Sequence, residues 1–221
     1  MKKLLFIVIV GLLSACSIQH EVSFNQNNDG HYKVILDLSE MMKKMGKLKE
    51  KDKNPEKNIF GKPNPHNNDM TMVEYVDATD GISNTTQVTD TINALFGLEF
   101  DFNSPEALNV AINKMKHHKA LEQDSLAELG TYTYFEFDSK QLIVRDELDN
   151  SDEDDESAKS MQKMFKEFGY TWDLSFEKTV KKVDSKLNYE LNENDQHLIF
   201  ESNFDEMMNR EEETIATITF K

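Results

Sequence analysis

Cys16 is the side chain best suited to covalent chemistry, because it is the only cysteine in the 221-residue chain. It follows the positively charged start Met1-Lys2-Lys3, an apolar run over residues 4–12 and the small residues Ser14 and Ala15. Lysines, a short apolar core and small residues before a cleavage site are the layout of a secretory signal peptide. The sequence therefore predicts a signal peptide over residues 1–15 and export of the remaining chain.

The four residues Leu13-Ser14-Ala15-Cys16 resemble the lipobox of bacterial lipoproteins. The resemblance implies that Cys16 receives a diacylglyceryl thioether, becomes the mature N-terminus and carries acyl chains such as palmitate. One acyl chain holds a protein at a membrane only marginally, whereas two or three hold it almost permanently. Because Ser17 and not Asp follows the cysteine, the resemblance also implies an outer-membrane lipoprotein that faces the periplasm.

Two other interpretations of the N-terminus stay open. The apolar core over residues 4–12 could be an uncleaved membrane anchor, although a helix needs about 20 apolar residues to cross a bilayer. An ordinary signal peptide could instead be cleaved near Ala15 and leave Cys16 as a free thiol.

The charge of the chain limits its partners. The formal net charge is −16, and removal of residues 1–15 takes away two lysines and no acid, which makes it −18. Nucleic-acid binding needs clustered Lys and Arg, so we expect no nucleic-acid partner. With Cys16 lipidated, no thiol remains for a disulfide, a zinc site or catalysis.

Alternating apolar residues and strong turn signals predict an α+β domain. Residues 20–37 read as a β-hairpin around the turn Asn27-Asn28-Asp29-Gly30, and residues 131–145 read as a second hairpin. Further strands are predicted at 72–76, 98–102, 172–176, 186–191, 197–201 and 214–220, and helices at 39–48, 87–96, 105–129 and 161–168, with a helical turn within 203–213. Hairpins pair antiparallel, so we expect an antiparallel β-sheet built from hairpins with several helices packed on it.

The length suits one domain over residues 16–221. Residues 50–69 hold three of the four prolines and predict a flexible insertion. Residues 146–157 are strongly acidic and predict a solvated loop.

A second resemblance involves the C-terminal strands. The stretch from Tyr170 to Val183, with its Val-Lys-Lys-Val step, precedes a turn at 192–195 and the apolar strand His197–Phe200. With the early hairpin after Cys16, this pattern resembles LppM-like lipoproteins and uncharacterised lipoproteins of Bacteroidota. The resemblance implies a β-rich envelope domain and assigns no site residues.

Known catalytic and metal-binding motifs are missing. The chain has no His-Glu-x-x-His, no Gly-x-Ser-x-Gly and no phosphate-binding glycine loop. His117 and His118 are adjacent, which suits a shared metal poorly, and the acidic stretch 149–154 lacks the glycine of an EF-hand loop. We therefore expect no metal, no cofactor and no enzymatic activity.

Methionines and phenylalanines are the remaining candidates for a site. They read most simply as core-facing stripes, but two Met-rich helices could also line an apolar groove for an acyl chain or peptide, formed by Met41, Met42, Met45, Met161, Met164 and Phe165. The favoured hypothesis is a non-enzymatic envelope lipoprotein that binds a protein partner or an apolar ligand near the membrane. The alternatives are a structural or stress-related lipoprotein without a small-molecule ligand, and a carboxylate-dependent hydrolase of envelope polymers.

Overall fold

The computed structural model describes two β-sheets and three helices, within residues 16–39, 42, 71–116, 132–138, 140–147 and 168–221. One sheet, sheet A, comprises β1 (Ser17–Phe24), β2 (Gly30–Asp37), β3 (Ile82–Asp90), β4 (Leu95–Phe102), β7 (Gly169–Phe176), β9 (Tyr189–Leu191) and β10 (His197–Asn203). The other, sheet B, comprises β5 (Phe135–Asp138), β6 (Gln141–Arg145), β8 (Val180–Ser185) and β11 (Thr214–Phe220). The helices are α3 (Met72–Asp77), α4 (Pro105–Lys116) and α7 (Phe204–Met208).

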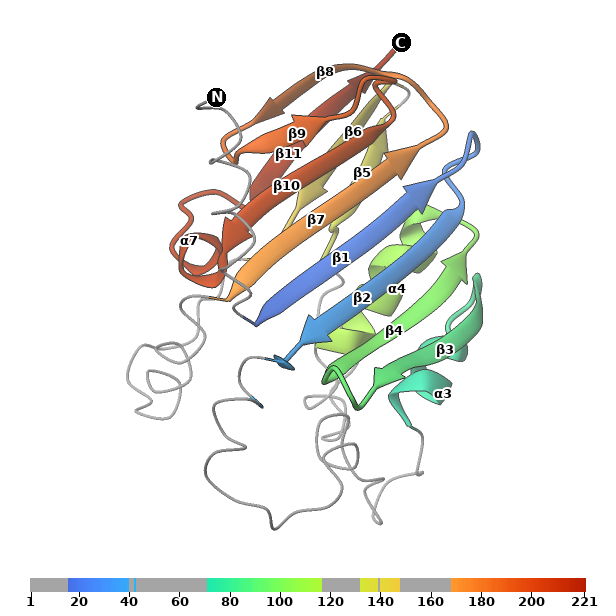
Figure 1. Ribbon diagram of the computed structural model, residues 1–221. Coiled ribbons are helices and arrows are strands. Elements are labelled where there is room, and N and C mark those ends of the chain that lie inside the picture. The colour runs from blue at the N-terminus through green and yellow to red at the C-terminus, as the bar shows by residue number, and fades with distance from the viewer. Residues whose placement is uncertain (1–15, 40–41, 43–70, 117–131, 139, 148–167) are drawn as a thin grey trace.

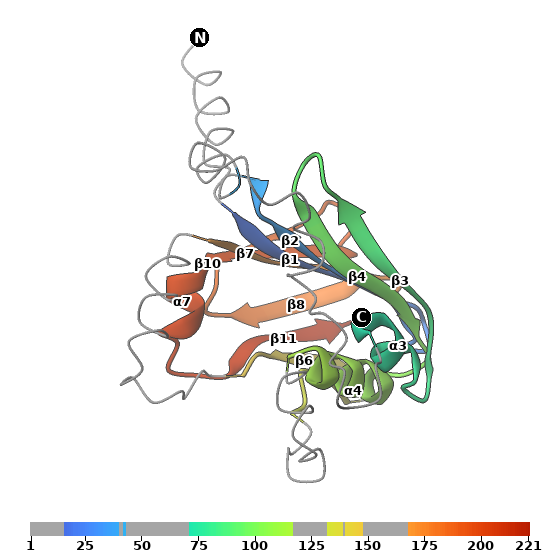
Figure 2. The same ribbon diagram turned by 90° about the horizontal axis from the view of Figure 1, so that it is seen from below.

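The two sheets face each other across one core (Figures 1 and 2). Sheet A has the strand order β3-β4-β2-β1-β7-β10-β9, and sheet B has the order β5-β6-β11-β8. Sheet B has four described strands and sheet A has seven, so sheet B leaves part of sheet A uncovered. There α4 lies beside sheet B, under β3 and β4, and it also contacts β5 and α3 (Figure 2). None of the described helices is long and apolar enough to cross a membrane.

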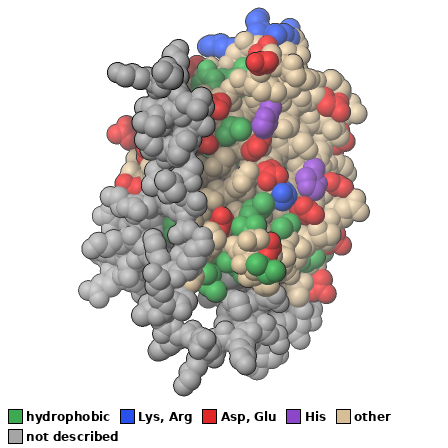
Figure 3. Space-filling model, in the orientation of Figure 1, with side chains coloured by type: hydrophobic (Ala, Val, Ile, Leu, Met, Phe, Trp, Pro, Cys, Tyr) green, Lys and Arg blue, Asp and Glu red, His purple; other side chains and the backbone are tan. Residues whose placement is uncertain are grey.

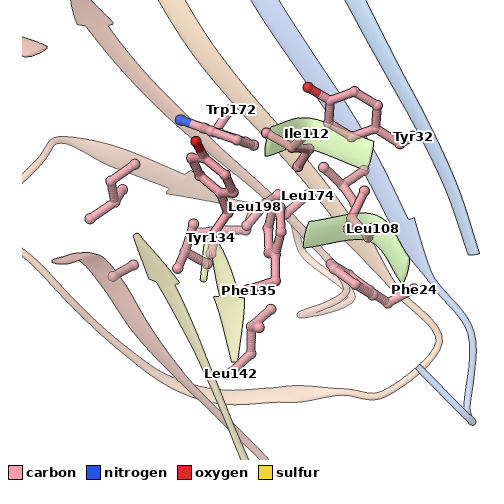
Figure 4. Packing of buried hydrophobic residues seen from close by; sticks show 14 of the residues in the cluster. Phe24, Tyr32, Leu108, Ile112, Tyr134, Phe135, Leu142, Trp172, Leu174 and Leu198 are labelled. Carbon is pink, nitrogen blue, oxygen red and sulfur yellow. The ribbon is translucent and has the colours of Figure 1, made fainter. Parts of the chain in front are cut away.

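The core lies between the sheets because apolar residues alternate along the central strands. Successive side chains of a strand point to opposite faces, so every second residue can be buried. In β7 this gives buried Tyr170, Trp172, Leu174 and Phe176. Trp172 meets Phe135 of sheet B edge to face, with ring centroids 5.6 Å apart, and Leu142 and Leu174 lie close by (Figure 4).

The prediction of a single antiparallel sheet is wrong in two respects, although the α+β class agrees with the structure. There are two sheets, and sheet A is mixed because β1 pairs parallel with β7, with Ser17 opposite Gly169 and Phe24 opposite Phe176. The local pairs are antiparallel, as β1 with β2 and β5 with β6. A parallel neighbour requires a long crossover connection, and here the segment between β1 and β7 includes β2, β3 and β4 of sheet A, α4, and β5 and β6 of sheet B.

Two element predictions are also wrong. Residues 72–76 were expected as a strand but form α3, which starts with a capping box in which Thr71 and Glu74 bond each other's backbone N–H. Residues 87–96 were expected as a helix but belong to β3, a turn and β4. The β-branched Val88 and Thr89 favour the extended backbone of β3.

Two asparagines of α4 bond the backbone at the start of β5, the edge strand of sheet B, and just before it. Asn109 Nδ2 donates to the Phe135 carbonyl (2.8 Å), while its Oδ1 accepts from the N–H groups of Tyr134 (3.0 Å) and Phe135 (2.9 Å). Asn113, one turn later, makes the equivalent pair of bonds with the backbone of Tyr132 (2.7 and 3.0 Å). A buried backbone group without a partner is costly, so these amides take the place of a neighbouring strand.

Replacement of Asn109 by alanine is expected to lower the free energy of unfolding by roughly 2–3 kcal/mol, because it leaves two buried N–H groups and a carbonyl without their partner. Chemical denaturation followed by the fluorescence of Trp172, the single tryptophan, measures the change. The control is Asn194→Ala in the exposed β9–β10 turn, which should stay within about 0.5 kcal/mol of the natural chain. Equal effects of the two changes would contradict this role of Asn109.

Candidate functional site at the Cys16 end of the sandwich

Cys16 lies directly before β1, at one end of sheet A. Its carbonyl oxygen accepts a hydrogen bond from the N–H of Gly169 (2.9 Å), which fixes it beside the start of β7. The regular pairing of β1 begins with the next residue, Ser17. A group attached to Cys16 would therefore be joined to the folded domain without an intervening linker.

The Cys16 side chain is buried, with 4% of its surface exposed. It packs in an apolar group, here called the Cys16 cluster, with buried Leu38, Ala94, Phe96 and Phe168 and half-buried Leu36. Buried cysteines commonly act as small hydrophobic side chains. The sequence singled out Cys16 by its type and position, but only the structure shows that its thiol packs between strand ends.

Met42 is the one described residue of the predicted apolar groove. Its N–H donates to the Leu38 carbonyl (2.9 Å), and its side chain is 39% exposed, near the Cys16 cluster. The other members, Met41, Met45, Met161, Met164 and Phe165, lie outside the described residues. The insertion 50–69, His117, His118 and residues 148–157 of the acidic loop also lie outside them. The groove and the insertion therefore stay predictions.

Asp146 was predicted to lie in a solvated loop, but the structure buries it. It is 5% exposed and accepts hydrogen bonds from Lys116 and from the Tyr170 hydroxyl (3.0 Å). Arg210 approaches the same carboxylate at 3.7 Å and donates to the Asp146 carbonyl (3.4 Å). These four residues, the Asp146 cluster, come from the ends of α4 and β6, from β7 and from the segment after α7.

Two opposing effects act on the Asp146 carboxylate. Burial alone disfavours its charged form, but the charge and hydrogen bond of Lys116, together with Arg210, outweigh burial and lower the pKa of Asp146. Burial, followed by the charge of Asp146, raises the pKa of the Tyr170 phenol well above its usual value. Tyr170 therefore keeps its proton and remains a donor.

His20 lies beside this cluster in the core. Its ring stacks on Trp172, with centroids 4.2 Å apart, and its Nδ1 shares a hydrogen bond of 2.7 Å with the Tyr32 hydroxyl. Burial, reinforced by the positive charge of Lys116, lowers the pKa of His20 from 6.5 to about 3. His20 is therefore neutral near pH 7 and does not exchange protons there, which suits a structural role.

The outer face of sheet A carries a different polar site. A shallow depression of about 260 Å³ is lined mainly by polar side chains of β1, β2, β7 and β10, namely Glu21, Ser23, His31, Asp173, Ser175 and His197. Two histidine side chains lie among carboxylates on this face (Figure 3). Among the described residues, no group of three or more His, Cys, Asp and Glu is arranged to hold a metal ion.

Each carboxylate of this depression already has a basic partner. Lys33 Nζ lies 3.2 Å from Glu21, and His197 Nε2 lies 2.5 Å from Asp173. Glu21 and Asp173 are directly opposite in the β1–β7 register, so they are one pair of neighbouring carboxylates on this face. The sequence could not single them out among 41 acids.

Comparison with known proteins gives a similarity in structure and none in sequence family. No protein-family model matches the chain, and no curated protein matches it. Among solved structures it is similar to the folded domain of LppM from Mycobacterium tuberculosis, determined by NMR, with 9% sequence identity and a TM-score of 0.41 over 93% of this chain and 89% of that chain. Similarity at this level assigns neither a family nor an activity to the chain.

Proposed function

We propose that this chain is a lipoprotein of the bacterial cell envelope, lipidated on Cys16, whose β-sandwich binds a protein partner or an apolar ligand at the membrane. The observation that carries the proposal is the position of Cys16, which follows Leu13-Ser14-Ala15 and lies directly before β1. The outer membrane, on its periplasmic side, is the favoured location because Ser17 follows the cysteine.

The attachment geometry supports close contact with the bilayer. Each CH₂ of an inserted acyl chain contributes about 0.8 kcal/mol, so two or three chains suffice as an anchor. The hydrogen bond from Gly169 to Cys16 fixes the attachment point to β7, which leaves almost no free chain between lipid and sheet. The proposal also requires the Cys16 sulfur to project past the end of the sheet, out of the Cys16 cluster, when it carries the lipid.

The same geometry favours binding over catalysis. His20 is neutral and enclosed, and Glu21 and Asp173 are each paired with a basic side chain on an open face. A general acid and base for glycoside hydrolysis need a substrate cleft between them. A non-enzymatic role is therefore the proposal, and hydrolysis of envelope polymers through Glu21 and Asp173 is the less favoured alternative.

Lipidation is tested by incorporation of labelled palmitate in a bacterial host, with Cys16→Ser as the variant and Ser17→Ala as the matched control. The natural chain and the control should incorporate label and lack residues 1–15, whereas Cys16→Ser should incorporate none. Intact mass spectrometry measures both the acyl mass and the loss of residues 1–15. A natural protein that begins elsewhere, or that carries no acyl mass at Cys16, overturns the proposal.

The binding role needs a separate measurement. Affinity capture from detergent-solubilised membranes should recover the same protein partner, or a co-purifying lipid, in repeated preparations. If neither is recovered although Cys16 is acylated, the structural or stress-related role replaces the binding role.

A further inference from the structure

Ile92 is the most exposed large hydrophobic side chain in the described part of the chain. It is 93% exposed at the tip of the turn between β3 and β4. Only two other large hydrophobic side chains in that part are exposed, Met42 and Tyr189, at 39% and 44%. Polar residues and glycine dominate most turns, so an isoleucine there calls for a physical reason.

The turn that presents Ile92 is held in one conformation. Asp90 Oδ1 accepts hydrogen bonds from the N–H groups of Ile92 (3.0 Å) and Asn93 (3.1 Å), and Asp90 Oδ2 accepts from Asn93 Nδ2 (2.6 Å). The Leu38 N–H donates to the Ala94 carbonyl (3.0 Å), which ties the turn to the end of β2. Ile92 is therefore displayed on a structured support.

This turn lies at the same end of sheet A as Cys16. Ser17 pairs with Asp37, and Asp37 pairs with Leu95, the first residue after the turn. Neighbouring strands are about 4.8 Å apart, so the turn lies roughly 10 Å across the sheet from the start of β1. Ala94, in the turn, packs in the Cys16 cluster itself. The exposed Met42 is hydrogen-bonded through its N–H to the Leu38 carbonyl of the same cluster.

We infer that the β3–β4 turn inserts Ile92 into the surface layer of the lipid bilayer, as a second membrane contact beside the lipid on Cys16. This inference rests on the proposed function. Two contacts about 10 Å apart fix the tilt of a rigid body better than one, so the sandwich stands on its Cys16 end. The opposite end, with the β9–β10 turn, then points away from the membrane.

The chemistry of the turn points to a bilayer as its partner. A protein interface needs a contiguous apolar area, whereas one aliphatic side chain on a rigid tip suits insertion between lipid headgroups. The neighbouring acid, Asp90, is occupied by hydrogen bonds within the turn, and no Lys or Arg lies between Asp90 and Leu95 to bind anionic headgroups. The net charge of −16, which becomes −18 without residues 1–15, disfavours anionic surfaces, so zwitterionic phosphatidylcholine vesicles are the appropriate probe.

The test keeps Ile92 in place and attaches a fluorophore beside it. Because Cys16 is the only cysteine and is acylated in the lipoprotein, Thr91→Cys supplies the one free thiol for an environment-sensitive label. The labelled lipoprotein, with residues 1–15 removed and Cys16 acylated, is reconstituted into phosphatidylcholine vesicles that contain a lipid with a quencher near its headgroup. Matched proteins carry Thr91→Cys with Ile92→Ser, and Asn194→Cys at the opposite end of the sheet.

Quenching of the label at position 91 should be at least twofold stronger than at position 194, and Ile92→Ser should remove most of that difference. Equal quenching at the two positions, or quenching that is unchanged by Ile92→Ser, overturns the inference. Mass spectrometry of the same samples separates the two proposals. An acylated protein with equal quenching refutes only the Ile92 contact, whereas a protein without acyl mass refutes the proposed function and this inference with it.

Discussion

Replacement of Asp146 by alanine should lower the free energy of unfolding by about 3–5 kcal/mol, because it breaks a buried ion pair by removing one partner. Asp146 is the buried carboxylate between Lys116 and Arg210, and it also accepts from the Tyr170 hydroxyl. Its removal leaves one cation deeply buried and the other partly buried, without their counter-ion. Loss of one partner is far more costly than loss of an exposed pair, because an uncompensated charge stays in a medium that solvates it poorly.

The matched control is Glu212→Ala, which breaks the exposed ion pair between Lys186 and Glu212. Lys186 Nζ lies 2.5 Å from Glu212, with side chains 74% and 58% exposed, and such pairs contribute about 0–1 kcal/mol. Asp146→Asn should fall between the two changes, because it keeps an acceptor for Tyr170 but loses the charge. Urea denaturation of each purified variant measures the differences. A cost below about 1 kcal/mol for Asp146→Ala would show that the cluster does not stabilise the fold.

Stability should also decline as the pH falls from about 6.5 towards about 3, the window set by the two pKa values of His20. In the unfolded chain His20 binds a proton below its ordinary pKa of 6.5, whereas in the folded protein it stays neutral until about pH 3. The unfolded state therefore binds more protons throughout this window, and protonation favours unfolding. One such group contributes a slope of up to about 1.4 kcal/mol per pH unit.

His20→Phe isolates this contribution. Phenylalanine keeps a ring against Trp172 but cannot titrate, so the dependence of stability on pH should flatten between pH 6.5 and 4.5. The pKa of Asp146 is lowered from its usual 3.8, so most of its own loss of stabilisation falls below this range. The variant should be less stable at pH 8, because the Tyr32 hydroxyl loses its hydrogen bond.

The control is His31→Asn, which removes a histidine that is 43% exposed on the outer face and bonded to Asp101. Between pH 6.5 and 4.5, the change of unfolding free energy with pH should be closer to the natural chain for His31→Asn than for His20→Phe. Denaturation at a series of pH values gives all three slopes. If His20→Phe has the same slope as the natural protein, His20 titrates normally and the neutral, enclosed histidine described above is incorrect.

Local patterns determined much of the secondary structure. Alternation over Tyr170–Phe176 and Leu98–Phe102 identifies strands, because burial of one sheet face needs an apolar residue at every second position. The Ser104-Pro105-Glu106 start of α4 is equally local. Even α3, which we predicted as a strand, carries a local signal in the Thr71–Glu74 capping box. The lipobox-like residues before Cys16 single out this thiol as the predicted lipidation site, which stays a prediction.

Tertiary structure alone decided which segments meet. The parallel pairing of β1 with β7 joins residues about 150 positions apart, and no short-range pattern specifies that choice or the division into two sheets. Asp146 reads as the start of a solvated acidic run because its counter-ions, Lys116 and Arg210, arrive from distant elements. The burial of Cys16 and the placement of the Ile92 turn at the same end of sheet A depend in the same way on strand order. Periodicity is a property of neighbouring residues, whereas burial and charge compensation depend on what the rest of the chain brings into contact.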